Sequence, residues 1–566
     1  MKIKKILSFL LAAVLLFGFS GCGNRTEDEE NSPNPEMTEN NELVIYHSST
    51  SLSPMLMEIT EKYSAETGKK VSSKLAGTDF LGEMKTNSAA IYIIDTHSDL
   101  SEWHSGGLFN DFLTDSSLSS VTDKIHSGLY YSADGIGNYG IPLVLEGYGY
   151  IFDREMISAI FGGENAGKLI DDLRTCSFTE FESFVSAVET WIASPSAAKI
   201  KIGENEYTFF AEKTGKAENL KGIFSLNSES TRAMEHLMSY ALATKFRSRY
   251  DVMSVTEEAV SGMEKVFDAY ARVLDFHTSH IAGTEGTLGR GEEFTGGDYN
   301  YSTSIDLLTR GNALFYPGGT SDTADFEKSA EGFSSNLDII PMKLPLSDEE
   351  ITVPGMTAEK LQSSIVIGSR YYIAINPKAE ESAAKDARDF VSWLFGSEGG
   401  SNAFSGAFGA VPFNFEYVMG ENPADSEGSS PADESGNAGQ SAESSSAESG
   451  SPEGKSSQEN NAAPENASPE ENQTPEENPD MIGPINPSHN ISNSLMSAVA
   501  EYYAAGNWIP DLSFALPADF AEKILGEGLS DFWGMENWAD SDKKGLVERI
   551  IGGWKDRINK DNSAVG

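Results

Sequence analysis

Polar side chains that could hold a small polar molecule stand just beyond three of the expected strands. They include imidazole, hydroxyl, carboxylate and phenol groups, which exchange hydrogen bonds with a polar solute, while a tyrosine ring also stacks on apolar faces. Ligands of α/β proteins collect beyond the carboxyl ends of strands, so these positions are candidate contacts. The groups are His47, Ser48 and Ser49 after a strand at Leu43–Tyr46, Thr96, His97 and Ser98 after one at Ala90–Ile94, and Glu146 and Tyr148 after one at Ile141–Leu145.

Each of these residues also has an ordinary structural interpretation. A lone histidine is more often structural than a ligand contact, which applies to both His47 and His97. Glu146 would otherwise be a solvated or salt-bridged loop carboxylate, and Tyr148 would pack in the core.

Familiar catalytic and metal-binding motifs are missing. The sequence contains no H-E-x-x-H, no G-x-S-x-G and no Walker loop. His277 and His280 are better interpreted as the end of an amphipathic helix than as metal ligands, and Cys176 as a buried, inert thiol. We therefore expect no metal, no cofactor and no enzymatic activity. A pair of carboxylates suited to glycoside hydrolysis remains an alternative, because 87 acidic residues offer many such pairs.

Composition narrows the class of protein further. The chain has 566 residues with 41 basic and 87 acidic side chains, a net charge of −46 that repels phosphate backbones, so nucleic acid is not expected as a partner. Cys22 and Cys176 are the only cysteines, which excludes a disulfide scaffold and a cysteine-based zinc ribbon.

The N-terminus has the pattern of an export signal. Three lysines among the first five residues precede an uncharged apolar run, Ile6–Phe19, that is short for a membrane span. Phe19-Ser20-Gly21-Cys22 then resembles a lipobox, at which bacterial prolipoproteins are cleaved and acylated on the new N-terminal cysteine. Residues 1–22 are thus expected to be a lipoprotein signal peptide and 23–42 a disordered acidic tether. An ordinary signal peptide or a single anchor helix is the alternative.

Beyond the tether, strand and helix patterns alternate, which predicts an α/β fold with mostly parallel sheets. Extended segments at Ile141–Leu145 and Tyr150–Phe152 bracket a glycine-containing stretch, and apolar residues at helical spacing from Met263 to Val273 mark a long helix. The region 421–489 departs from this pattern, because it is rich in Ser, Glu, Pro and Asn and has almost no branched aliphatic residues. Such a composition cannot offset the entropy of ordering by burial, so it predicts a disordered insertion. Ordered-looking sequence resumes at Ile491, and its last helix shows apolar residues from Val547 to Ile558 at helical spacing.

The order of several short motifs resembles the extracellular solute-binding proteins of the carbohydrate group (family 1), the receptors of bacterial ABC importers. Each motif is weak alone, but together they span most of the mature chain. The motifs are the strand, loop and helix of Leu43–Gly68, Tyr139-Gly140-Ile141-Pro142 with Tyr150-Ile151-Phe152-Asp153-Arg154, Leu308–Gly319, Phe390–Leu394 with Ser397-Glu398-Gly399, and Gly409-Ala410-Val411-Pro412.

The resemblance implies a two-lobed periplasmic-binding-protein-like fold of type II. Lobe I would comprise residues 43–145 and 369–406, and lobe II residues 146–368, 407–420 and 490–560. Carried over to this chain, the crossings between the lobes fall near Val144–Glu146, Ser364–Ser369 and Ala407–Pro412.

The resemblance also implies a function and a site. The protein would be a monomeric lipoprotein on the outer face of the cell membrane, anchored through lipid on Cys22, that captures a sugar between its lobes and delivers it to an ABC permease. Glu146 would bind sugar hydroxyls at the first crossing. Gly318 and Gly319 match the glycines after which the family often carries a stacking tryptophan, but here Thr320 follows them, and the nearby Tyr316 is the candidate substitute. Trp508 falls where the family has a late aromatic contact, with a core anchor as the alternative. A lipid-anchored enzyme, an adhesive surface protein or a receptor for another polar solute are the other functions considered.

Overall fold

The structure is a computed structural model of the whole chain. It describes residues 42–50, 52–77, 82–83, 89–94, 107, 115–123, 125–126, 128–132, 137–228, 232–330, 336–408, 490–516 and 528–565. The expected lipidation site Cys22, residues 23–41 of the expected tether, the acidic region 421–489 and residues 409–412 of the third expected crossing therefore lie outside the described residues. From Leu43 onward the chain forms one compact unit.

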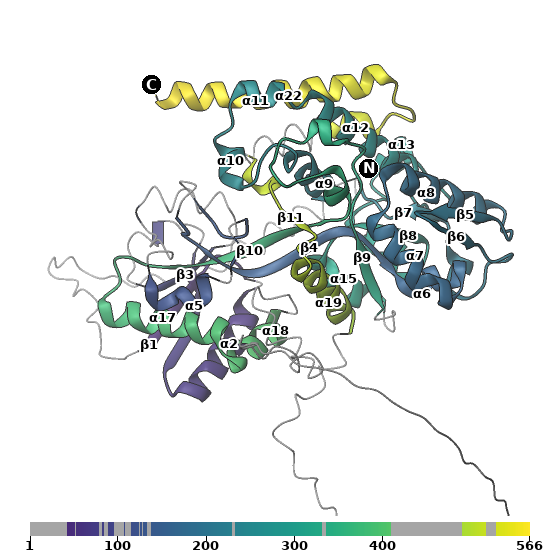
Figure 1. Ribbon diagram of the computed structural model, residues 1–566. Helices are drawn as coiled ribbons and strands as arrows, with labels where there is room; N and C mark the ends of the chain where they lie inside the picture. The colour runs from purple at the N-terminus through teal and green to yellow at the C-terminus, as the bar shows by residue number, and fades with distance from the viewer. Residues whose placement is uncertain are drawn as a thin grey trace, which may run out of the picture. The chain divides into compact units, whose positions relative to one another are not determined.

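A single sheet runs through this unit, and two long strands, β4 (Ile141–Asp153) and β10 (Ile365–Ile375), lie side by side at its centre (Figure 1). The strand order is β2-β1-β3-β10-β4-β8-β7, with β11 on β10 and β9 on β4. The remaining strands are β1 (Glu42–His47), β2 (Lys70–Leu75), β3 (Ile91–Ile94), β7 (Gly222–Phe224), β8 (Ala313–Gly319), β9 (Leu337–Ile340), β11 (Trp508–Pro510) and the separate hairpin of β5 (Lys199–Ile202) and β6 (Asn205–Thr208).

The sheet is mixed, so the expectation of mostly parallel strands was wrong. The pairs β1–β3, β7–β8 and β10–β11 are parallel. β4 pairs antiparallel with β10, β8 and β9, and β10 pairs antiparallel with β3. The alternation of strand and helix patterns predicts parallel crossovers but does not reveal that two long strands return through the middle of the sheet.

β4 joins two segments that the sequence analysis treated as separate strands. The strand is continuous through Gly147 and Gly149. The absence of a side chain at these two positions lets neighbouring elements approach the backbone closely. A Cβ at Gly147 would lie 2.3 Å from Val499 of α19 (Asn490–Ala504). The glycines thus mark close packing within one strand and not a break between two.

The two faces of the central pair differ in character. On one face, a continuous hydrophobic cluster reaches from Ile45 in β1 through Ile367 in β10 to Val499 in α19. On the other face, two separate clusters lie at the two ends of the pair, one around Tyr150 and Phe224 and one around Tyr92 and Tyr372. Because side chains alternate between faces along a strand, the apolar core is interrupted only on the second face.

Helices cover the sheet at both ends, and α2, α17 and α18 pack together beside β1 and β3 (Figure 1). The helices are α2 (Leu52–Thr67), α5 (Ser119–Thr122), α6 (Arg154–Phe161), α7 (Gly163–Thr175), α8 (Phe178–Ala193), α9 (Arg232–Leu242), α10 (Arg249–Met253), α11 (Glu257–Ser261), α12 (Glu264–Ser279), α13 (Glu292–Thr295), α14 (Tyr301–Thr309), α15 (Thr323–Ser329), α16 (Ala358–Gln362), α17 (Glu381–Gly396), α18 (Glu398–Phe408), α19, α21 (Gly528–Trp533) and α22 (Asp540–Val565).

Side-chain caps fix the first residues of several of these helices. The Asp153 carboxylate accepts a hydrogen bond from the Glu155 amide where β4 turns into α6. The Asn300 side chain accepts one from the Thr303 amide at the start of α14. Each cap satisfies a backbone donor that the first helical turn leaves unpaired. Among the described residues, none of the helices has both the length and the apolar character that crossing a membrane requires.

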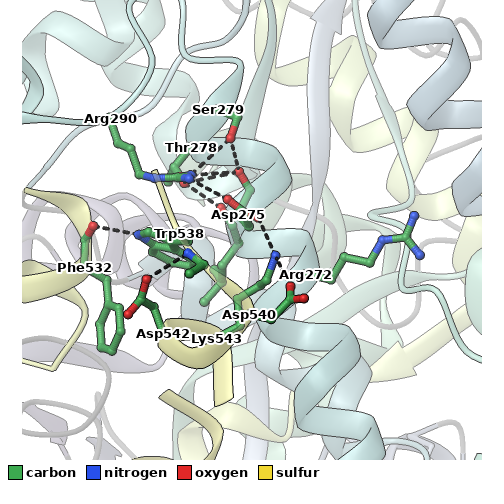
Figure 2. A network of polar contacts seen from close by, with 12 residues as sticks. Arg272, Asp275, Thr278, Ser279, Arg290, Phe532, Trp538, Asp540, Asp542 and Lys543 are labelled. Carbon is green, nitrogen blue, oxygen red and sulfur yellow. Dashed lines mark hydrogen bonds and ion pairs between the residues drawn. The ribbon is translucent and has the colours of Figure 1, made fainter. Parts of the chain in front are cut away.

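A buried ionic network attaches the C-terminal segment to α12 (Figure 2). Arg290, whose side chain is 4% exposed, lies 2.6 Å from Asp275 and stacks on Trp538 with 4.7 Å to the ring centroid. Lys543 of α22 reaches the other oxygen of Asp275 at 3.1 Å. One carboxylate thus neutralises two cations from different parts of the chain.

We expect Asp275→Asn to lower the free energy of unfolding by about 2–4 kcal/mol, because it leaves the buried Arg290 without its anionic partner. The matched control is Glu206→Gln, since both side chains of the Lys199–Glu206 pair are 60% exposed. Exposed pairs contribute about 0–1 kcal/mol. Urea unfolding of both variants measures the difference, and equal losses would contradict the assignment of the network as a structural anchor.

Candidate functional site

The candidate site is the polar gap on the interrupted face of the central strand pair. Glu146 of β4 lies opposite Gly368 of β10 in the antiparallel register, and Tyr148 lies opposite Val366. Paired residues share a face, so Glu146 lies between the cluster that contains Tyr150 and the cluster that contains Tyr372. Polar side chains from distant segments converge here.

Glu146 accepts a hydrogen bond from the Tyr148 hydroxyl two residues along the same strand. Glu146 is only 8% exposed, whereas the sequence analysis treated its alternative as a solvated loop carboxylate. Burial, together with the nearby carboxylates of Glu146 and Asp511, raises the pKa of Tyr148 well above its ordinary value. The phenol therefore keeps its proton and serves Glu146 as a permanent donor.

The ring of Tyr148 is held between two elements. It stacks on the imidazole of His236 in α9, with ring centroids 3.4 Å apart and planes 18° apart. On another side it meets Gly319 at the end of β8, where a Cβ would lie 2.3 Å from the Tyr148 ring. Glycine at this position makes room for the ring, so part of the Gly318-Gly319 signature has a packing role.

Asp511, directly after β11, is a fully buried carboxylate that contacts the His236 side of this ring stack. It contacts the His236 ring nitrogen Nδ1 at 3.1 Å and accepts hydrogen bonds from the hydroxyls of Ser239 at 2.7 Å and Ser513 at 2.6 Å. Burial alone would raise the pKa of Asp511, but the charge of His236, then that of Arg249, and the bond from Ser513 hold it below its ordinary value. Asp511 is thus an anion fixed by its partners.

Arg249 connects Asp511 to β10. Its Nε donates to the Asp511 carbonyl at 2.8 Å, and its guanidinium donates to the Tyr372 hydroxyl. The Tyr372 hydroxyl also bonds Ser369, whose own hydroxyl reaches the Leu129 carbonyl at 2.7 Å. The polar cluster therefore includes residues of both β4 and β10.

Of the residues predicted at the first strand end, His47 and Ser48 are described in detail. His47 is 1% exposed, and its Nδ1 lies 2.8 Å from the Ser49 carbonyl; burial lowers the pKa of this imidazole, which favours its neutral form. The Ser48 hydroxyl is buried and has no hydrogen-bond partner. Thr96, His97 and Ser98 lie outside the described residues. The structure does not show contacts between the His47 group and Glu146.

Tyr316 and Trp508 lie on the other face of the sheet from Glu146. Tyr316 is paired with Ile151 and donates a hydrogen bond to Asp322 at 3.0 Å, while its ring packs against Phe326. Trp508 is paired with Ile365, stacks edge-on against His126 and packs against the continuous cluster. Stacking of either ring on a ligand stays a prediction.

Among the described residues, no group of three His, Cys, Asp or Glu side chains is placed to hold a metal ion. His277 is buried and bonded to the Tyr150 hydroxyl at 2.5 Å, and burial lowers its pKa to about 3. Burial raises the pKa of the Cys176 thiol. Both groups are thus kept uncharged within the core, as expected for structural residues.

His236, Asp511 and Arg249 were not predicted from the sequence. They lie on α9, after β11 and on α10, far from β4 in the sequence, and each looks like an ordinary surface residue in its local context. The only available signal was that Asp511 follows a proline-terminated apolar run, which is weak. Together with Glu146 and Tyr148 they form a buried polar cluster, whose carboxylate oxygens are the groups that could accept hydrogen bonds from a ligand.

Comparison with known proteins identifies the fold. No protein-family model and no curated protein sequence matches the chain. Its structure is similar to that of a family 1 extracellular solute-binding protein from Bifidobacterium longum subsp. infantis, with 12% identity, a TM-score of 0.50, and coverage of 91% of this chain and 98% of that one.

Two further structures are similar. One is apo RafE from Streptococcus pneumoniae, with 13% identity, a TM-score of 0.50, and coverage of 91% of this chain and 97% of that one. The other is the bacterial solute receptor AcbH, described as exclusive for b-D-galactopyranose, with 10% identity, a TM-score of 0.53, and coverage of 92% and 98%. At such identities the likeness establishes the fold, and the expected two-lobed α/β fold is confirmed.

We expect Asp511→Asn to destabilise the protein by about 2 kcal/mol at pH 7, because its bonds to charged and hydroxyl partners weaken. The folded-state pKa of Asp511 is depressed, so its contribution is complete above the unfolded pKa of about 4 and is lost as the pH falls through the lower, folded value. The difference between wild type and variant should therefore shrink between about pH 5 and pH 2. Urea unfolding at several pH values measures it, and a difference independent of pH would contradict the ionised state of Asp511.

Proposed function

Because the chain has the fold of the extracellular solute-binding proteins, we propose that this protein captures a saccharide and delivers it to an ABC permease in the membrane. The observation that carries the proposal is the Glu146–Tyr148–His236–Asp511 cluster on the interrupted face of the central strand pair. In a two-lobed protein, such a polar gap between two apolar clusters is where a ligand would lie.

The chemistry of the cluster supports a polyhydroxylated ligand. Glu146 is a carboxylate already oriented by one phenol donor, and a carboxylate offers further lone pairs to ligand hydroxyls. A saccharide presents pairs of adjacent hydroxyls, and hydrogen bonds to a charged acceptor contribute about 1.5–3 kcal/mol each. Preference for b-D-galactopyranose in AcbH, which shares the fold, is consistent with this class of ligand.

The proposal includes closure of two lobes around the ligand. β4 and β10 would be two of the crossing segments, with lobe boundaries near Val144–Glu146 and Ser364–Ser369. Tyr371 in β10 has a backbone φ of 57°, an unusual conformation for a bulky residue in a strand. Backbone strain of this kind is often found where the chain changes conformation.

The proposal extends to the location and partners of the protein. A lipid on Cys22 would hold it at the outer face of the cell membrane, where a monomer would deliver its ligand to the permease. We propose a binding protein and not an enzyme, because the fold is that of substrate-binding proteins.

A calorimetric titration of the purified protein lacking residues 1–22 tests this function. We expect at least one of glucose, galactose, maltose, lactose, maltotriose and raffinose to bind with a Kd in the micromolar range or below, and to raise the melting temperature. Chromatography of the same mixtures should show no product. Turnover of a sugar would favour the enzyme alternative, and no binding by any member of the panel would refute the proposed saccharide class.

We expect Glu146→Gln to weaken binding of that sugar about ten- to hundredfold, because the amide loses the charge and one acceptor position. The amide oxygen still accepts from Tyr148, so the melting temperature without sugar should change by less than about 2 °C. Glu206→Gln, in the exposed β5–β6 hairpin, is the control and should bind normally. A drop in the melting temperature with unchanged affinity would identify Glu146 as purely structural.

A further inference from the structure

Asn227 lies at the same edge of the sheet as the candidate site but two strands away. It follows β7 by three residues, beside the carboxyl end of β8, and α14 begins at this edge with its cap residue Asn300. Its backbone is fixed on both sides. The Ser225 amide donates to the Phe315 carbonyl at 2.8 Å, and the Ser228 amide donates to the Tyr299 carbonyl at 2.8 Å.

The hydrogen bonds around Asn227 determine which way its amide faces. The Asn227 Nδ2 donates to the Ser304 hydroxyl at 3.2 Å, and that hydroxyl donates to the Tyr301 carbonyl at 2.7 Å. A hydroxyl has one proton, and Ser304 has committed its proton to Tyr301. Ser304 can therefore only accept from Asn227, which orients the amide nitrogen toward Ser304 and the amide oxygen away from it.

The amide oxygen of Asn227 is consequently an acceptor without a donor. Asn227 is 5% exposed, and its Oδ1 is buried with no hydrogen-bond partner. Leaving a buried acceptor unpaired costs free energy, so its retention at a sheet edge calls for a donor that is not part of the fold.

We infer that Asn227 is a second ligand-binding residue, whose Oδ1 accepts a hydrogen bond from a hydroxyl of an oligosaccharide that extends along this edge from Glu146. The inference rests on the proposed function and names its ligand more closely. Because Oδ1 can only accept, it selects a hydroxyl or amine donor at this point and disfavours a carboxylate.

Continuity between the two positions supports one extended site. The sheet order places β8 between β4 and β7, and neighbouring strands lie about 4.8 Å apart, so about 10 Å separates β4 from β7. Thr320, directly after β8, contacts β4 between these positions, because its hydroxyl accepts from the Gly147 amide at 3.2 Å. Such a span exceeds a single pyranose ring and suits two or more linked sugars.

Asn227→Ala tests the inference with the saccharides of the panel above. We expect affinity for the largest saccharide that binds to fall about tenfold or more, and affinity for the monosaccharide unit held at Glu146 to stay within about twofold. Asn227→Ala removes the unpaired acceptor together with the 3.2 Å bond to Ser304, and because these two effects oppose each other the melting temperature without sugar should change by less than about 2 °C. Asn165→Ala is the control, because the Asn165 amide donates to the Phe161 carbonyl at 3.1 Å on α7, away from this edge.

The alternatives give different results. Unchanged affinity for every saccharide would mean that Oδ1 meets only a buried water, and would overturn the inference. Equal loss for mono- and oligosaccharides together with a lower melting temperature would mean a purely structural role, and would also overturn it. Wild-type protein that binds monosaccharides only would refute the extended site while leaving the proposed function intact, whereas absence of all binding would refute the proposed function itself.

Discussion

The antiparallel pairing of β4 with β10 is the constraint on which the rest of the structure depends. The register places Glu146 opposite Gly368 and Tyr372 opposite Pro142. The other strands of the sheet extend from this pair on both sides, with β3, β1 and β2 beyond β10 and β8 and β7 beyond β4. Because side chains alternate, this single pairing assigns the apolar residues Leu145 and Ile367 to the continuous core and the polar residue Glu146 to the opposite face. A shift of one residue would exchange the two sets, so the large apolar burial on one face fixes the position of the polar group on the other.

Fixing a carboxylate in a nearly buried position has consequences for its surroundings. Glu146 needs donors, and Tyr148 supplies one; Tyr148 in turn is held by His236, and His236 by Asp511. Each group is paired before a ligand arrives, which avoids the cost of burying a lone charge. Small residues serve the same arrangement, since a Cβ on Gly319 would collide with the Tyr148 ring. Rigidity of this kind reduces the reorganisation that binding requires and favours selectivity for one pattern of hydroxyl groups.

Local sequence patterns predicted much of this architecture because they report on burial and capping. The strands at Leu43–Tyr46 and Ala90–Ile94 and the helix beginning near Met263 are found close to their expected positions. Glu146 and Tyr148 were expected in a loop after a strand, whereas both lie within β4, where two residues of separation place them on one face. Patterns cannot report on pairing between distant segments. That limit explains the mistaken parallel sheet, the division of β4 into two strands, and the omission of His236, Asp511 and Asn227, whose roles depend on contacts with residues far away in the sequence.

The segment after residue 489 supplies residues to both the central sheet and the candidate site. Val499 of α19 packs against Gly147 beneath the central pair, β11 extends the sheet beside β10, and Asp511 enters the polar cluster directly after β11. The Asp275–Arg290–Lys543 network then attaches α22 to α12. The entropy of closing a loop grows only slowly with its length, so about 80 intervening residues cost little more than a short connection. The insertion is therefore compatible with a folded body whose core and candidate site both require the residues on either side of it.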